Sequence, residues 1–102
     1  MHSTIPISNE AIQNNLKRMT NQIYKLLPNR EEGIDWQKPL QTIIIELTGM
    51  SSLFTDQTEL FSLLCKLEAL KTLDKEEDFM LYRKTIFECL GLMDVIKKQC
   101  QD

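Results

Sequence analysis

Apolar side chains recur at alternating intervals of four and three residues in three stretches of this chain, and leucines cover a broader arc in a further stretch. In chain order, the four stretches are 12–26, 36–54, 60–70 and 79–100. Because an α-helix turns once in about 3.6 residues, this spacing places the apolar side chains on one face of each helix. Four amphipathic helices joined by short links predict an all-α fold, a small four-helix antiparallel bundle. The length of 102 residues fits a single helical domain over residues 1–102.

Capping residues and prolines suggest where the first helix begins and ends. Ser8 is a suitable N-cap for a helix over residues 9–27, because its hydroxyl can accept a hydrogen bond from a free backbone N–H. Pro28 is predicted to end this helix, since proline disfavours the α conformation in the residue before it. We expect residues 1–7 to form a flexible tail.

The second and third helices are expected to begin at aspartates. Asp35 can cap the second helix, whose apolar face continues past Gly49 to Phe54. Asp56 can open the third helix, and Glu59 follows it by three residues, which is the spacing of a capping box.

A polar cluster at residues 74–78 separates the third apolar face from the fourth. Asp74 and Glu77 repeat the capping spacing. The apolar face after the cluster is rotated by roughly a third of a turn from the face that ends at Leu70. This phase change predicts a reversal between two helices. One continuous helix over residues 57–99 is the alternative, because no glycine or proline separates the two faces.

Residues suited to catalysis or metal binding are sparse. His2 is the only histidine and lies in the expected tail, so a Cys–His or Ser–His pair has no rigid support. The chain has neither the Cys and His spacing of a zinc site nor a glycine-rich phosphate-binding loop. Glu76 and Glu77 are adjacent, point in different directions on a helix, and are typical of a solvated capping turn. We therefore predict that the chain is not an enzyme and uses no metal or cofactor.

The cysteines and the hydropathy of the chain suggest a cellular location. Cys65, Cys89 and Cys100 form an odd set without a C-x-x-C pair, which is typical of reduced thiols in a cytosol. Cys89 and Cys100 lie on the fourth apolar face, where packing is the simpler interpretation. Residues 1–7 lack the basic and apolar segments of a signal peptide, and no apolar run is long enough to cross a membrane. These features predict a cytoplasmic protein that does not contact membranes.

A basic face on the first helix suggests one class of partner. The formal net charge of −3 argues against general attraction to nucleic acid. Lys17, Arg18 and Lys25 nevertheless lie opposite the apolar face of this helix, and no acidic residue occurs between Glu10 and Glu31. Such a face can contact phosphates and base edges. A small nucleic-acid-binding regulator is therefore an alternative hypothesis, beside the simpler interpretation of an ordinary solvated face.

Apolar residues also lie away from the core-facing sides of the second and fourth helices. They are Ile45 in the second helix, and Met80, Leu81, Phe87, Leu92 and Val95 in the fourth. A contiguous patch of exposed apolar residues marks an interaction surface. The alternative is a central fourth helix that is buried on most sides. The leading hypothesis is a non-enzymatic protein-interaction module (an adaptor, inhibitor or assembly factor) that self-associates into a homodimer.

The link after the first helix provides a further candidate contact. Arg30 and Trp36 are residue types that are enriched at binding hot spots, although Trp36 also fits the second apolar face. The run from Leu26 to Gly33, followed by Asp35-Trp36 and Pro39-Leu40, resembles segments of small uncharacterised helical proteins of Gram-positive bacteria and their phages. This resemblance implies a bacterial or phage origin, and it implies no activity, cofactor or catalytic residue.

Overall fold

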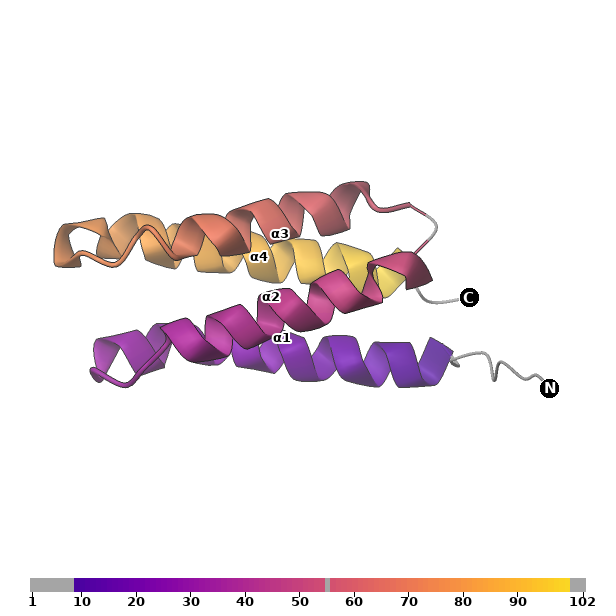
Figure 1. Ribbon diagram of the computed structural model, residues 1–102, viewed down its shortest axis with the longest axis horizontal. Coiled ribbons are helices and arrows are strands. Elements are labelled where there is room, and N and C mark those ends of the chain that lie inside the picture. The colour runs from indigo at the N-terminus through magenta and orange to yellow at the C-terminus, as the bar shows by residue number, and fades with distance from the viewer. Residues whose placement is uncertain (1–8, 55, 100–102) are drawn as a thin grey trace.

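The computed structural model describes residues 9–54 and 56–99, and this part of the chain forms an antiparallel four-helix bundle (Figure 1). The helices are α1 (Asn9–Glu31), α2 (Gln37–Met50), α3 (Thr58–Leu70) and α4 (Phe79–Gln99). Single 3₁₀ turns, η1 (Ser51–Leu53) and η2 (Glu76–Asp78), follow α2 and precede α4. No strand occurs in the described residues, so the predicted all-α bundle is confirmed. Ser8, His2, Cys100 and the expected tail at residues 1–7 lie outside this part.

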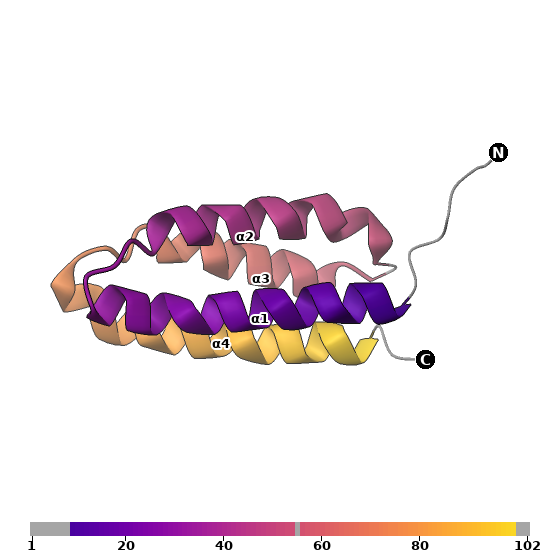
Figure 2. The same ribbon diagram turned by 90° about the horizontal axis from the view of Figure 1, so that it is seen from below.

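Each helix packs against two neighbours, in the order of an up-and-down bundle. α1 packs against α2 and α4, and α3 packs against the same two helices from the other side. α2 and α4 therefore occupy diagonal corners of the bundle (Figure 2). The outer faces of these two helices point in different directions.

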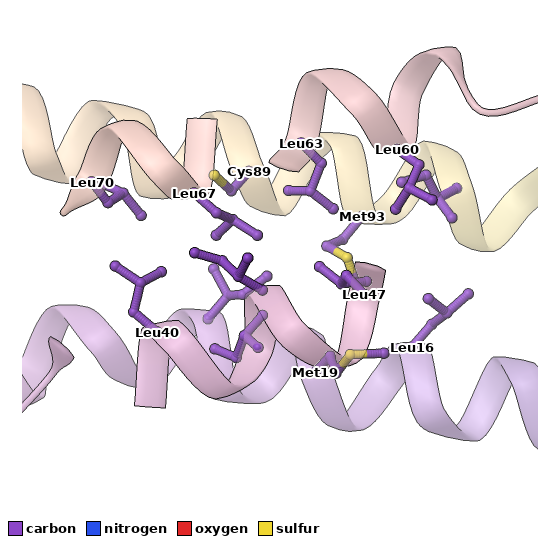
Figure 3. Close-up of a cluster of buried hydrophobic side chains, with 14 of the residues drawn as sticks. Leu16, Met19, Leu40, Leu47, Leu60, Leu63, Leu67, Leu70, Cys89 and Met93 are labelled. Atoms are coloured by element: carbon purple, nitrogen blue, oxygen red, sulfur yellow. The ribbon is translucent and has the colours of Figure 1, made fainter. Parts of the chain in front are cut away.

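The predicted apolar faces meet in one continuous core. Every helix contributes side chains that are almost fully excluded from solvent, and Figure 3 shows a central group of them. This group includes Leu16, Met19, Leu40, Leu47, Leu60, Leu63, Leu67, Leu70, Cys89 and Met93. Full burial of one such side chain stabilises the fold by roughly 1.5–3 kcal/mol. The four faces together therefore provide the main stabilisation of the bundle.

The first helix does not end at Pro28, and that prediction is wrong. Proline removes one backbone N–H, but its own carbonyl still accepts a hydrogen bond from Glu32 N, at 3.0 Å, and α1 continues to Glu31. Gly33 then adopts a left-handed φ of 73°. In the geometry of a Schellman motif, Gly33 N donates to the Arg30 carbonyl and Ile34 N donates to the Asn29 carbonyl. The left-handed glycine terminates α1, since most other residues are strained in this conformation.

The second helix begins as predicted and ends earlier than predicted. Asp35 Oδ1 accepts hydrogen bonds from Gln37 N at 2.9 Å and from Lys38 N at 3.4 Å, which confirms its capping role. Gly49 stays inside the helix, but α2 ends at Met50 rather than at Phe54. The η1 turn follows, and Phe54 has an extended backbone and is still buried in the core. The apolar spacing therefore persists across a change of backbone conformation.

At the start of the third helix, Asp56 makes the predicted capping hydrogen bond, but the predicted capping box does not form. Asp56 Oδ1 accepts a hydrogen bond from Thr58 N at 3.0 Å, and this bond lowers the pKa of the Asp56 carboxyl. In a capping box, Glu59 would accept a hydrogen bond from the backbone of the capping residue. Glu59 Oε2 is instead buried without a hydrogen-bond partner in the described structure.

The third and fourth helices are separate, so the alternative of one helix over residues 57–99 is wrong. α3 ends at Leu70, the chain turns back over residues 71–78, and α4 begins at Phe79. The two helices then pack side by side in opposite directions (Figures 1 and 2). The phase change across the polar cluster thus marks a true reversal of the chain.

Candidate interaction surface

The outward-facing side of α4 carries four large apolar side chains that solvent reaches. The exposed fractions are 70% for Met80, 52% for Leu81, 46% for Phe87 and 41% for Val95. We call these four residues the outer face of α4. Toward the N-terminal half of the helix, three of them line an open concavity of about 750 Å³ together with Arg83, Lys84 and Glu88.

The sequence of α4 produces this face through a second helical spacing. Tyr82, Ile86 and Cys89 lie on the side of the helix that is buried in the core. Phe87 follows Met80 by seven residues, which is close to two helical turns, and Val95 follows Phe87 by eight residues, which places it about 80° around the helix from Phe87. The three residues therefore form a second apolar line, about 80° wide, along the side of the helix away from the core. α4 is apolar on two sides, and the bundle covers only one of them.

Leu92 differs from the other α4 residues that the sequence singles out. Its side chain is half-buried and packs against the hydrophobic core. The expectation of an uncovered side chain does not hold for this residue, because the inner flank of α4 is covered by the bundle. Leu92 therefore contributes mainly to folding rather than to an exposed surface.

Ile45 is exposed, but it does not share a surface with the outer face of α4. Its side chain is 61% exposed on α2, which occupies the diagonal corner of the bundle. The predicted apolar surface on the second and fourth helices is therefore divided into two separate places.

Sequence reasoning missed the exposure of Phe61. This α3 side chain is 69% exposed and, with Thr48 and Leu64, lines a small concavity of about 190 Å³ beside α2. Phe61 lies about 100° around the helix from Leu60, outside the narrow arc of the fully buried leucines. This offset from Leu60 indicates an exposed position for Phe61. In the sequence, the apolar arc of the third helix is broad and includes Phe61, so the offset was not recognised.

Charged side chains border the outer face of α4. The Arg83 guanidinium lies over the Phe87 ring, 5.2 Å from its centroid. Glu88 Oε1 pairs with Lys66 Nζ of α3 at 3.2 Å, and Asp94 Oδ2 pairs with Lys98 Nζ at 3.3 Å. The face is therefore an apolar strip with both signs of charge along its edges, which is a common composition at protein interfaces.

Arg30 and Trp36, the predicted loop contacts, interact with their own chain. The Arg30 guanidinium lies 4.3 Å from the centroid of the Tyr82 ring and 5.3 Å from that of Trp36. It also donates hydrogen bonds to the backbone carbonyls of Leu73 and Lys75. This cluster ties the end of α1 to the turn between α3 and α4.

Tyr82 forms the buried floor of the same cluster. Its hydroxyl donates a hydrogen bond to the Leu26 carbonyl at 3.2 Å, and its ring meets Trp36 edge-on at 5.0 Å. Burial raises the pKa of the phenol well above its usual value, although the nearby Arg30 charge opposes this effect. The Arg30 cluster is therefore a contact within the folded chain, in which the guanidinium already packs against the aromatic rings.

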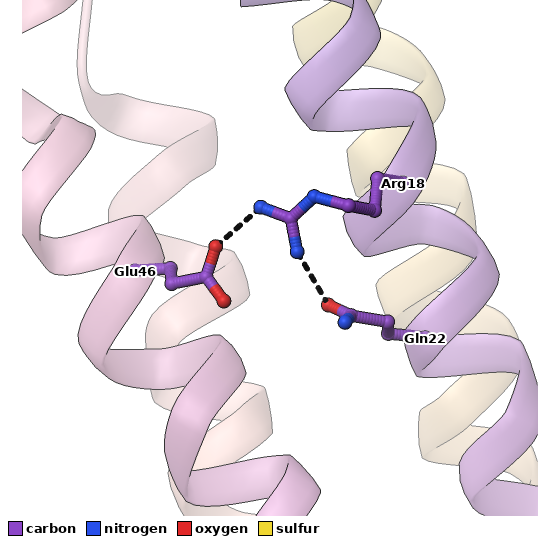
Figure 4. Close-up of polar contacts among 3 residues, drawn as sticks. All are labelled: Arg18, Gln22 and Glu46. Atoms are coloured by element: carbon purple, nitrogen blue, oxygen red, sulfur yellow. Dashed lines mark hydrogen bonds and ion pairs between the residues drawn. The ribbon is translucent and has the colours of Figure 1, made fainter.

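The predicted basic face of α1 is partly neutralised. Lys17, Arg18 and Lys25 are exposed, as expected. Arg18 Nη2, however, pairs with Glu46 Oε2 of α2 at 2.5 Å, and Arg18 Nη1 donates to Gln22 at 3.3 Å (Figure 4). The hydrogen bond to Glu46 raises the pKa of the Arg18 guanidinium. The face therefore contains a carboxylate that the sequence of α1 alone does not reveal.

The two cysteines in the described residues have different environments. Cys89 is buried in the core, and burial raises the pKa of its thiol to about 12. Cys65 is exposed on α3, and both thiols are free. Over residues 9–54 and 56–99, no three His, Cys, Asp or Glu side chains are grouped so that they could hold a metal ion. In the same part of the chain, no helix combines the length and the apolar character needed to span a membrane.

Comparison of the whole chain with protein-family models, with curated proteins and with solved structures finds no match.

Proposed function

We propose that this chain is a non-enzymatic protein-interaction module, an adaptor, inhibitor or assembly factor, that self-associates through the outer face of α4. The observation that carries the proposal is the second apolar line of α4, which the bundle leaves uncovered. Met80 and Phe87 provide its largest side chains, and the concavity beside them gives a second helix a place to pack.

A single helix face gives an interface at the small end of the usual range. We therefore expect a weak association that depends on protein concentration. The proposal includes a reducing, cytoplasmic environment, which the free thiols of Cys65 and Cys89 support.

Sedimentation or light scattering over a tenfold or wider range of concentration tests self-association. The wild-type mass should rise above the monomer mass of 11.9 kDa as the concentration increases. A double variant, Met80→Lys with Phe87→Glu, should remain monomeric. Both side chains are exposed in the free chain and lie outside the core, so the variant should keep its helical circular dichroism.

Phe61→Lys is the matched control, because it removes an exposed aromatic ring from α3 and leaves the outer face of α4 unchanged. This control should associate like the wild type. Leu92 is unsuitable as a test position, because it contacts the core and its substitution would lower both binding and stability. A wild-type chain that stays at the monomer mass over the whole range contradicts self-association.

Nucleic-acid binding through the basic face of α1 is the second candidate function. The exposure of Lys17 and Lys25 on one helix supports it, and the Arg18–Glu46 ion pair weakens it. Replacing both lysines with glutamine should reduce binding to DNA or RNA at low salt, and the binding should decrease as salt is added. A flat titration of the wild-type chain against both nucleic acids excludes this function.

A further inference from the structure

We propose that the partner of the outer face of α4 is the α4 helix of a second copy, packed antiparallel about a two-fold axis that passes close to Phe87. This inference rests on the proposed function and specifies its partner and geometry. It is carried by the order of charges along the two edges of the face.

Each edge of the face carries a basic residue followed by an acidic residue. Arg83 and Asp94 are eleven residues apart, about three helical turns, so they lie on the same edge. Lys84 and Glu88 are one turn apart on the other side of the face, where Lys84 lies beside Met80, and the Glu88–Lys66 ion pair identifies this side as the one next to α3. On both sides of the face, therefore, the positive charge lies nearer the start of the helix.

A two-fold axis perpendicular to α4 reverses the direction of the helix and keeps each edge on its own side. In such a dimer Arg83 faces Asp94 of the second copy, and Lys84 faces Glu88 of the second copy. In a parallel pairing, the two-fold axis runs along the helices and each edge meets the other edge of the second copy at the same height, so that Arg83 lies beside Lys84 of the second copy and like charges repel there. Electrostatic complementarity thus selects the antiparallel arrangement.

The charged pairs and the apolar residues indicate nearly the same position for the axis. The midpoint of Arg83 and Asp94 lies between residues 88 and 89, and the midpoint of Lys84 and Glu88 is residue 86. If Met80 packs against Val95 of the second copy, the midpoint lies between residues 87 and 88. With the axis between residues 87 and 88, Arg83 is offset from Asp94 of the second copy by two residues, about 3 Å, and Lys84 from Glu88 by three residues, about 4.5 Å, which are offsets that these long side chains can span.

Gly91 gives the two helices room to approach at this position. It lies one turn after Phe87, it is exposed, and apart from its chain neighbours and the nearby backbone of α4, no atom lies within 4 Å of where a Cβ would stand. With the axis between residues 87 and 88, the Phe87 rings of the two copies lie beside each other, and the exposed Gly91 one turn further along leaves space for them. This places the largest apolar side chain of the face at the centre of the interface, where hot-spot residues are usually found.

Existing ion pairs are compatible with the dimer. Asp94 is paired with Lys98 and Glu88 with Lys66, and the side chains of both acids are more than 40% exposed. Exposed pairs of this kind contribute little to stability, so each carboxylate can accept a second cation without a large loss. Arg83 and Asp94 make the clearer test, because Glu88 also connects α4 to α3.

Charge reversal tests the arrangement. Arg83→Glu and Asp94→Arg should each weaken the homodimer by roughly tenfold, since each change places like charges together at two symmetric contacts. Mixing the two single variants should restore association as a heterodimer, and the double variant should again form a homodimer. Lys38→Glu, an exposed reversal on α2, is the control and should leave the association unchanged.

The possible outcomes distinguish the geometry from the proposed function. A dimer that Met80→Lys with Phe87→Glu dissolves, but that neither single charge reversal weakens, overturns the antiparallel arrangement and leaves the interaction surface in place. A monomeric wild-type chain overturns both. Single reversals that weaken the dimer, together with recovery in the mixture and in the double variant, support the two-fold antiparallel pairing.

Discussion

Replacing Arg30 with methionine should destabilise the bundle by about 3 kcal/mol. The guanidinium donates hydrogen bonds to the Leu73 and Lys75 carbonyls and lies 4.3 Å from the centroid of the Tyr82 ring. Hydrogen bonds to a charged group contribute about 1.5 kcal/mol each at the lower end of their range, which suits a half-buried side chain. The cation–π contact adds about 1 kcal/mol. Water can satisfy the two freed carbonyls in part, which returns about 1 kcal/mol.

Thermal unfolding at one fixed protein concentration measures this effect. For a domain of this size, a loss of about 3 kcal/mol corresponds to a fall in Tm of roughly 12–24 °C. Arg30→Lys keeps the charge but can reach only one carbonyl at a time, so it should fall between the wild type and Arg30→Met. The concentration is held constant because self-association would also raise the apparent stability.

Arg18→Met is the matched control for this experiment. Arg18 makes an exposed ion pair with Glu46, and such pairs contribute at most about 1 kcal/mol. If Arg30→Met unfolds at the same temperature as Arg18→Met, the Arg30 cluster does not hold the turn between α3 and α4. If Arg30→Lys is as stable as the wild type, the charge alone matters and the paired hydrogen bonds do not.

Three further results follow from the structure. Brief alkylation of the folded protein with iodoacetamide, followed by peptide mapping, should modify the exposed Cys65 and leave Cys89 unmodified. Burial keeps the Cys89 thiol protonated, and the protonated thiol does not react. Equal labelling of both cysteines would contradict the packing of Cys89. The raised pKa of Tyr82 means that its contribution to stability is complete below about pH 10, the usual value for an unfolded tyrosine, and is lost as the pH rises above it. Urea unfolding of Tyr82→Phe should therefore show a loss of about 1 kcal/mol at neutral pH and a weaker decline at alkaline pH than the wild type, whereas parallel declines refute the assignment. Gly49→Ala should stabilise the protein by about 0.5–1 kcal/mol in thermal unfolding, because Gly49 is an exposed residue inside α2 with open space where a Cβ would stand. A lower Tm for this variant would contradict the open space around Gly49.

The apolar spacing in the sequence was sufficient to predict the number of helices and the residues of the core. Leu16, Leu47 and Met93 lie at predicted positions in three different helices, and all three are fully buried. The pattern succeeds because each helix buries one face, whatever the position of its neighbours. Helix ends were less certain, since Pro28 and Gly33 both signal an end and only the left-handed backbone of Gly33 terminates α1.

The candidate sites were harder to predict, because they depend on which helix occupies which corner. Ile45 and Phe87 both lie away from the core-facing side of their helix. No sequence pattern, however, indicates that α2 and α4 occupy diagonal corners of the bundle. In the sequence, Arg18 belongs to a basic face, but in the folded bundle Glu46 of α2 lies beside it. Arg30 likewise meets Tyr82 only through the packing of α1 against α4. Contacts between residues far apart in the sequence follow from the assembled fold and carry no local signal.

The packing of α1 against α4 also affects the order in which the chain can fold during synthesis. Gln13 donates a hydrogen bond to the Lys97 carbonyl, and Tyr82 donates one to the Leu26 carbonyl, so both ends of α1 contact α4, which emerges from the ribosome after the other three helices of the bundle. Before α4 has emerged, α1, α2 and α3 can form only an open layer, in which the side of α1 that packs against α4 stays exposed to water. The nascent chain therefore stays exposed to chaperones and proteases until residues 79–99 arrive, and the bundle then closes in one late step.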